Sequence, residues 1–319
     1  MRIVVFSSKG RGPQVGSLVD GQVIDLHVAN NAIPADLLSV IQGGQKTLDL
    51  IRAVTDGISG IRGDAVRQLA DVRLHAPWPG KRIALLGGNY GQHLYDVQKG
   101  HPGIESVEQV VRDTRLAGQW GFWKTLDHIT APGEDLVFPR NVKLLDYEGE
   151  VGIVISTRTK NFKARNIADH IWGVTLLNDW SDRGGGGAFL HRPYSFNLAK
   201  NFDASLTIGP CIVVDEITDP QNVDVETRVN GERRQAFNTR DMIFSFAEAV
   251  EDISRSLSLV PGDIFSGGTG AGTAIDTVGM SHMTDAASVR WFLKPGEVVE
   301  VSSPRIGAFR NRLVADTDE

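Results

Sequence analysis

Cysteine, basic charge and long apolar runs are all scarce in this chain of 319 residues. Its one cysteine, Cys211, excludes an internal disulfide framework, and its place in the apolar stretch 208–214 predicts a buried small hydrophobe. The net charge of −6 provides no basic surface for nucleic acid. No apolar run approaches the ~20 residues of a membrane span, and the chain opens as a strand without a signal-peptide pattern. We therefore expect a cytoplasmic protein that binds neither nucleic acids nor membranes.

Short strands separated by turn residues make up the beginning of the chain. Apolar runs alternate with turns over residues 1–27, where Asp20-Gly21 is the strongest hairpin signal, and helical spacing follows at 37–41 and 47–54. Prolines and glycines near residue 77 then interrupt the pattern. We predict a small β-rich N-terminal domain over residues 1–76 and a larger domain over residues 77–319.

The larger domain shows the same preference for strands. Strands are expected at 82–86, 171–177, 205–214, 223–229 and 298–301, and an amphipathic helix is expected at 242–259. Residues 95–115 are polar and weakly periodic, which is typical of a helical lid segment. Many short strands with few helices favour an α+β fold that is predominantly β, with mixed topology, over a doubly wound parallel sheet.

The chain is organised around residues 144–155, where acidic residues precede a β-branched apolar run typical of a buried strand. Side chains alternate along a strand, so Asp146, Glu148 and Glu150 are expected on one face. Three carboxylates on one face repel one another and are costly to bury unless a cation lies between them. A divalent-metal site and a solvated acidic strand end are both compatible with this stretch alone.

Two further positions extend the metal interpretation. Asp179 ends an apolar strand, where it either caps a turn or completes a set of three hard oxygen donors with Glu148 and Glu150. Such a set suits Mg²⁺, Mn²⁺ or Ca²⁺. His93 follows a Gly-Gly-Asn-Tyr turn and is either a surface histidine or a general base, and Asp96 three residues later would orient it on a helix.

Glycine-rich loops at 184–187 and 267–273 also invite a phosphate-binding interpretation. Neither contains the lysine of a P-loop or the spacing of a dinucleotide-binding turn. We interpret both as backbone features, which are tight turns, hinges or backbone amides offered to a ligand.

In this order, the motifs resemble those of the fumarylacetoacetate hydrolase family. The matching stretches are Asn89-Tyr90…His93, Asp146-Tyr147-Glu148-Gly149-Glu150, Asn178-Asp179-Trp180-Ser181…Arg183, Lys200-Asn201-Phe202-Asp203, Gly209-Pro210, Val229-Asn230-Gly231-Glu232, Thr239-Arg240-Asp241-Met242-Ile243-Phe244 and Pro261-Gly262-Asp263-Ile264. The resemblance covers roughly residues 80–313, and residues 1–27 resemble the small N-terminal unit that many members carry. The resemblance implies a metal-dependent catalytic domain of mixed β-roll type over residues 77–319, and a homodimer.

The resemblance also implies roles for individual residues. Metal binding falls to Glu148, Glu150 and Asp179, catalysis to His93, Asp96 and Lys200, and substrate binding to Tyr90, Arg183 and Thr269. The implied metal is Mg²⁺, with Mn²⁺ or Ca²⁺ as alternatives. Gly184 and Gly186 stand where the family usually has Asp and Gln, so the substrate contacts differ from the usual pattern.

From these residues we expect a hydrolase that cleaves a C–C bond in an acylpyruvate or a related 1,3-dicarbonyl 2-oxo acid. The metal would stabilise negative charge on the substrate oxygen while His93 activates water. Decarboxylation, hydration or isomerisation of a 2-oxo acid at the same metal is the first alternative. A non-haem iron oxygenase and a non-catalytic module with a structural Ca²⁺ are the others.

Overall fold

The computed structural model describes residues 1–57, 60–61, 63–140, 142–184, 193–283 and 285–316, so most of the glycine run at 184–187 lies outside the described residues. The strands are β1 (Arg2–Ser8), β2 (Arg11–Val19), β3 (Gln22–Asp25), β4 (Val66–Gln68), β5 (Arg73–His75), β6 (Ile83–Gly87), β7 (Trp120–Lys124), β8 (Leu136–Val137), β9 (Leu145–Asp146), β10 (Gly149–Ile155), β11 (Ile171–Asp179), β12 (Ser181–Asp182), β13 (Leu206–Val213), β14 (Asp224–Val229), β15 (Glu232–Asn238), β16 (Ile264–Thr269), β17 (Val298–Ser303) and β18 (Gly307–Val314). The helices are α1 (Leu26–Ala29), α2 (Leu37–Gln42), α3 (Gly44–Asp56), α4 (Gly91–Gln98), α5 (Val107–Ala117), α7 (Pro193–Lys200), α8 (Phe246–Ser256) and α9 (Ala274–Val278). Short 3₁₀ helices occur at Gly63–Ala65, Leu69–Asp71, Ala164–His170, Thr239–Asp241, Met280–His282 and Val289–Trp291.

Two sheets dominate the described part of the chain. The larger has 11 strands in the order β4-β3-β2-β1-β13-β11-β10-β16-β6-β7, with β5 paired to β1. The smaller has five strands in the order β15-β14-β17-β18-β8. All strand pairs are antiparallel except β16–β6 and β18–β8, which are parallel. The prediction of a predominantly β, α+β fold with mixed topology is therefore confirmed.

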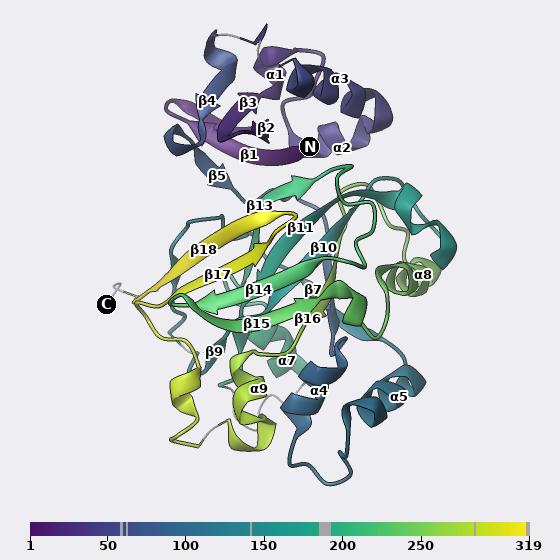
Figure 1. The fold of residues 1–319 in the computed structure, drawn as a ribbon, viewed down its shortest axis with the longest axis vertical. Helices are drawn as coiled ribbons and strands as arrows, with labels where there is room; N and C mark the ends of the chain where they lie inside the picture. The colour runs from purple at the N-terminus through teal and green to yellow at the C-terminus, as the bar shows by residue number, and fades with distance from the viewer. Residues whose placement is uncertain (58–59, 62, 141, 185–192, 284, 317–319) are drawn as a thin grey trace.

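The N-terminal residues form a separate lobe at the top of Figure 1. Its β2–β3 hairpin turns at Asp20 and Gly21, both with positive φ (49° and 76°), as expected for a tight two-residue turn that matches the strand twist. The lobe is not detached from the rest, because β1 pairs with β13 of the larger domain. The boundary near residue 77 stays a prediction.

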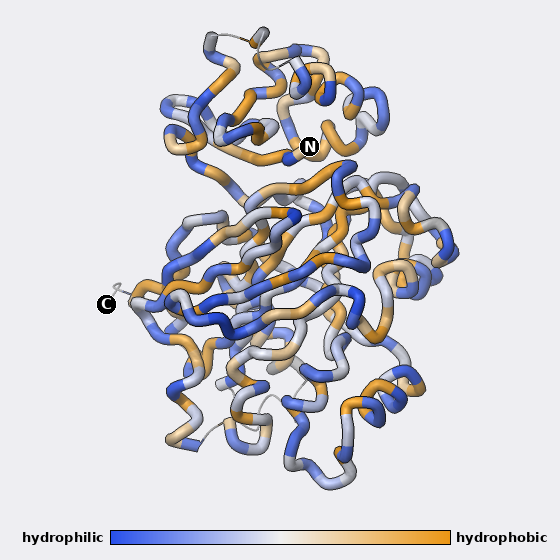
Figure 2. The backbone as a smooth tube through the Cα atoms, in the orientation of Figure 1, coloured by the Kyte–Doolittle hydropathy of each residue, from blue (hydrophilic) through white to orange (hydrophobic). Residues whose placement is uncertain are grey.

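The core of the larger domain fills the space between the two sheets. Val151 and Val174 from the large sheet belong to the same buried cluster as Val225 and Val301 from the small one. Figure 2 shows the outer hairpin β14–β15 as largely hydrophilic, in agreement with a sheet that turns one face to solvent. The hydrophobic effect of this burial holds the sheets together and leaves the strand ends available for polar side chains.

Element boundaries differ from the sequence prediction in three places. The acidic stretch is two strands separated by Tyr147-Glu148, because β9 pairs with β12 whereas β10 pairs with β11 and β16. The helix expected at 242–259 is shorter, because Ser245 caps α8 through a capping box with Glu248. The segment 95–115 contains parts of two helices, α4 and α5.

Two remaining expectations concern burial and membranes. Cys211 is a free cysteine and fully buried, as predicted. Among the described residues, no helix combines the length and the apolar character needed to cross a membrane.

Candidate active site

The pairing of β10 with β11 brings together three carboxylates that are separated in sequence. Gly149 faces Asn178 across the ladder, and the Asp179 backbone N–H donates to the Glu148 carbonyl at 2.9 Å. As a result, Glu148, Glu150 and Asp179 each place an oxygen within 4.8 Å of the others, and all three residues are buried. This is the set of oxygen donors expected from the sequence.

Asp146 does not join this group, which corrects the expectation of three carboxylates along one strand face. It lies at the end of β9, and its carboxylate accepts from the backbone N–H groups of Ala274 at 2.8 Å and Ile275 at 3.2 Å. It also accepts from Nε of Arg183 at 3.2 Å. Asp146 therefore anchors the start of α9 and orients Arg183.

Three cations surround the carboxylates. Lys200 Nζ donates to Glu148 Oε2 at 2.6 Å, Asp179 Oδ2 at 2.8 Å and Ser181 Oγ at 2.6 Å. Arg183 pairs with Glu148 as well as with Asp146. Lys124 lies 2.5 Å from Asp179 Oδ1 and is fully buried at the end of β7. Sequence reasoning missed Lys124, because a lysine that ends an aromatic strand carries no signal of its own.

The neighbouring glutamates differ in how their charges are compensated. Burial would raise the pKa of Glu148, but Lys200 and Arg183 outweigh it and hold that pKa well below its usual range. Burial raises the pKa of Glu150 well above its usual range, and the charges of Asp179 and Glu148 add to the effect. Among the described residues, its hydrogen-bond partner is the neutral hydroxyl of Ser266.

The charges of the site fit a divalent cation. Five buried carboxylates (Asp146, Glu148, Glu150, Asp179 and Asp276) face three basic side chains (Lys124, Lys200 and Arg183), so the carboxylates outnumber the bases by two when His93 is neutral. Buried charges without partners are costly. Glu148, Glu150 and Asp179 offer only oxygen ligands, which suit Mg²⁺, Mn²⁺ or Ca²⁺ better than a soft metal.

The structure pairs His93 with Asp276, whereas the sequence analysis expected Asp96. Nδ1 of His93, on α4, lies 2.8 Å from Oδ1 of Asp276, on α9, although the two atoms are not aligned as in a linear hydrogen bond. Asp96 is less buried and accepts from Gln92 Nε2 at 3.0 Å, one helical turn away. The sequence signal for Asp276 was the spacing Thr273…Asp276, which forms a capping box at the start of α9.

The carboxylate of Asp276 sets the proton affinity of His93. Burial disfavours the charged ring, but Asp276 and, more weakly, Glu148 outweigh it, so the pKa of His93 is raised. In the described part of the chain, Nε2 of His93 makes no hydrogen bond, which leaves this nitrogen for a ligand. A buried histidine held by a carboxylate is a suitable acid or base near neutral pH.

These groups line one cavity of about 330 Å³. Its polar lining consists of His93, Gln98, Glu148, Glu150, Arg183, Lys200 and Thr269. The hydroxyl of Thr269 is held by Gly149 and Gln235, because it donates to the carbonyl at 3.0 Å and accepts from the amide at 2.8 Å. Tyr90 is not among the described residues that line this cavity, since its ring packs in the core against Phe237 with 5.1 Å between centroids.

The sequence of this chain is similar to those of known proteins. The family pattern described as fumarylacetoacetate (FAA) hydrolase C-terminal matches residues 82–314. Oxaloacetate tautomerase YisK of Bacillus subtilis (strain 168) is 28% identical over 94% of this chain and 95% of its own. The mitochondrial oxaloacetate tautomerase Fahd2a of Rattus norvegicus is 29% identical over 98% of this chain and 92% of its own.

Solved structures show the same architecture. The fumarylacetoacetate hydrolase of the psychrophile Exiguobacterium antarcticum is 27% identical, with a TM-score of 0.70, and the match covers 99% of this chain and all of the other. The maleylpyruvate hydrolase of Sphingobium sp. SYK-6 is 21% identical, with a TM-score of 0.71 over 99% of this chain and 100% of the other, which shows the fold alone.

Proposed function

The chain belongs to the fumarylacetoacetate hydrolase family, and from this premise we propose that it transfers a proton at the carbon beside the 2-oxo group of a small 2-oxo acid. The reaction is the interconversion of the keto and enol forms. The observation that carries the proposal is a single cavity lined by both the carboxylate group Glu148/Glu150 and the histidine paired with Asp276. The relatives named oxaloacetate tautomerases support the same reaction type.

The carboxylates Glu148, Glu150 and Asp179 would hold the metal ion, Mg²⁺ or Mn²⁺. When bound, such an ion supplies Lewis acidity that polarises the 2-oxo group and stabilises negative charge on its oxygen. Lys200 orients two of the ligands, because its ammonium holds Glu148 and Asp179 at once. Positioning of this kind fixes the ligands before substrate arrives.

His93 moves the proton in this proposal. Nδ1 faces Asp276, so Nε2 takes the proton from the carbon next to the 2-oxo group while the C–H electron pair becomes the enol double bond. The same nitrogen then returns the proton to the 2-oxo oxygen, which completes the enol. Asp276 stabilises the imidazolium between the two transfers, because its carboxylate is buried against the ring.

C–C hydrolysis is the second candidate. The same histidine could take a proton from water instead of from carbon, as expected from the sequence, and the Exiguobacterium fumarylacetoacetate hydrolase is 27% identical over nearly the whole chain. Both reactions pass through negative charge on the 2-oxo oxygen, so the cavity serves either. Only the origin of the proton that His93 accepts distinguishes them.

The test follows proton exchange and bond cleavage in the same sample. The purified protein with Mg²⁺ or Mn²⁺ is given a panel of 2-oxo acids and acylpyruvates in D₂O, and NMR follows deuterium entry at the carbon beside the 2-oxo group. Exchange above the uncatalysed rate without cleavage, lost in His93→Ala, supports the proposal. The proposal is rejected in favour of hydrolysis if acylpyruvates are cleaved while, for every 2-oxo acid tested, neither deuterium exchange nor the conversion of enol to keto form is accelerated.

A further inference from the structure

The lining of the active-site cavity falls into two chemically different sets. The polar set comprises the carboxylates, His93, Arg183, Lys200, Thr269 and Gln98. The rest of the described lining side chains are apolar, contributed mainly by α4, β7, α7 and the segment after β16. The aliphatic members beyond the strand core are Leu94, Val97, Ile275 and Met280.

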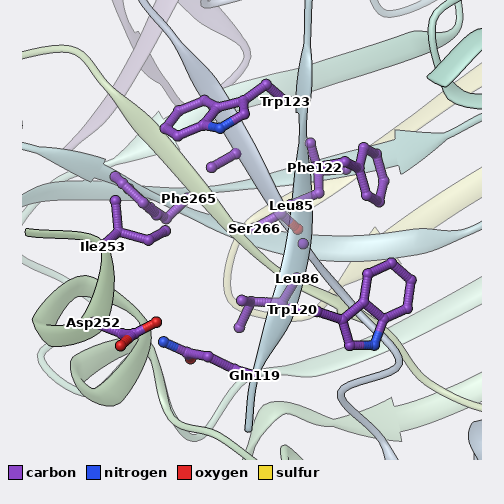
Figure 3. A pocket seen from close by; sticks show the side chains of 12 residues that line it. Leu85, Leu86, Gln119, Trp120, Phe122, Trp123, Asp252, Ile253, Phe265 and Ser266 are labelled. Atoms are coloured by element: carbon purple, nitrogen blue, oxygen red, sulfur yellow. The ribbon is translucent and has the colours of Figure 1, made fainter. Parts of the chain in front are cut away.

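Three aromatic rings complete the apolar set. Phe196 contacts Trp120 and Phe122 edge-to-face, with 5.6 Å and 5.3 Å between ring centroids. Figure 3, drawn around a smaller neighbouring cavity of about 150 Å³, shows Trp120 and Phe122 on one side of β7 and Trp123 on the other. Because side chains alternate along a strand, β7 directs the rings of Trp120 and Phe122 to the same side.

The backbone holds the outermost of these rings in place. Trp120 packs directly on Gly87, where an added Cβ would lie 2.3 Å from the indole ring. Only glycine permits this approach, so the position of the ring depends on the residue at 87. Trp120 is 47% exposed, which leaves part of its ring at the solvent side of the cavity.

The cations of the lining are already engaged by protein carboxylates. Among the described lining residues, the permanently charged cations are Arg183 and Lys200. Arg183 bridges Asp146 and Glu148, and Lys200 holds Glu148, Asp179 and the hydroxyl of Ser181. The 2-oxo acid group of a substrate would occupy this polar set. Among the described lining residues, a second carboxylate beyond this polar set would meet mainly apolar side chains, where a charge without a partner is costly to bury.

We propose that the substrate is a 2-oxo acid with an apolar tail, aryl or branched alkyl, and not a dicarboxylate. This inference rests on the proposed function for the 2-oxo head group and adds the chemistry of the tail. It separates this protein from relatives named after oxaloacetate, which carries a carboxylate at each end. The tail packs against Leu94, Met280 and the ring cluster of Trp120, Phe122 and Phe196.

The experiment compares ligands that differ only at the tail. Matched pairs of 2-oxo acids, each with either a phenyl or alkyl end or a carboxylate end of similar size, are tested for turnover with the Mn²⁺-loaded protein. Unreactive oxamates with the same two tails are titrated by calorimetry, which gives a dissociation constant independent of catalysis. We expect the apolar member to be favoured by at least about tenfold in both kcat/KM and affinity.

Two substitutions at one position test whether charge is the cause. Met280 is half-buried with a long unbranched side chain, so Met280→Lys places an ammonium in the apolar set at little change in length. We expect it to reduce the apolar preference about tenfold or more. Met280→Gln, polar but neutral, should reduce it far less. Leu116→Lys, at a position 85% exposed on α5, is the charge control and should leave the preference unchanged.

The outcomes distinguish the tail preference from the proposed reaction. A preference of the wild-type protein for carboxylate tails, in turnover or in binding, overturns the inference while the proposed reaction stands. Apolar-tailed oxamates that bind tightly without any turnover of the matched 2-oxo acids reject the proposed reaction and retain the tail preference. If neither oxamate binds and no member of the 2-oxo acid pairs is turned over, both are rejected. If Met280→Lys fails to fold, judged by circular dichroism, the wild-type pairs and Met280→Gln still decide.

Discussion

The core of the N-terminal lobe and the carboxylate centre both consist of buried side chains, but of different kinds. In the lobe, buried isoleucines from neighbouring segments, such as Ile24, Ile41 and Ile51, belong to an apolar cluster that continues into the larger domain. At the centre, buried ionisable groups arrive from six segments between residues 93 and 276, and most of them are held by a particular partner of opposite charge. Apolar burial stabilises the fold roughly in proportion to the apolar surface area removed from water, whichever apolar residue lies next to it. A buried charge stabilises only with its specific partner.

This difference predicts that equally buried residues respond differently to substitution. In the lobe, the loss should appear in the free energy of unfolding and leave catalysis intact. At the centre, it should appear in metal affinity, rate and pH dependence. Four substitutions test this contrast, taken from the largest expected effect to the smallest.

Glu148→Ala should have the largest effect. It removes a metal ligand and leaves Lys200 and Arg183 facing each other without the carboxylate that holds both. We expect metal affinity and kcat/KM to fall by about 10³-fold or more, and the free energy of unfolding to fall by about 3–5 kcal/mol. Isothermal titration with Mn²⁺ and a urea titration measure the two losses. Full activity in this variant would reject the metal assignment.

Asp276→Asn should reduce kcat by about 10²-fold, because the carboxylate that stabilises protonated His93 is lost. The pKa of His93 is raised above its ordinary value of 6.5, so the neutral base of the wild type is lost as pH falls through that raised value. In Asp276→Asn the acid limb of the kcat/KM profile should move to lower pH. Asp96→Asn, which removes the charge on the solvent side of α4, should leave the limb in place. An equal shift in both variants would contradict the pairing seen in the structure.

Glu150→Gln should change the pH dependence of the metal-free protein. The pKa of Glu150 in the fold lies well above its ordinary 4.5, so the folded state binds an extra proton between that value and the raised one. The free energy of unfolding therefore falls as pH rises through this window, by at most about 1.4 kcal/mol per pH unit. Above the window, the glutamine variant should be more stable than the wild type.

Metal provides the control for this third substitution. Added Mg²⁺ should stabilise the wild type and reverse the order of stability, because Glu150 then faces a cation. Thermal unfolding in EDTA and in Mg²⁺, measured across the pH range, compares the two proteins. A wild-type protein that is less stable with Mg²⁺ than without it would argue against a cation between these carboxylates.

The same difference explains how much the sequence could predict. Local patterns predicted the Asp20-Gly21 hairpin, the helices of the lobe and most strands, because turn residues and apolar periodicity act between near neighbours. The family resemblance supplied the carboxylates and His93. The partners were not predictable in the same way. Asp96 is near His93 in sequence, whereas Asp276 reaches it only because Asp146 anchors α9 beside α4.

Ile51→Val in the lobe should have the smallest effect. Ile51 is fully buried on α3, and the loss of one methylene from this apolar cluster should lower the free energy of unfolding by about 0.5–1.5 kcal/mol. Metal affinity, kcat and the pH profile should stay at wild-type values, because the cluster contains no charged group of the centre. Urea unfolding and the kinetic assay on the same preparation measure both. A change in kcat or in the acid limb would show that the lobe, whose strand β1 pairs with β13, is coupled to the site, and would contradict the contrast between the two regions.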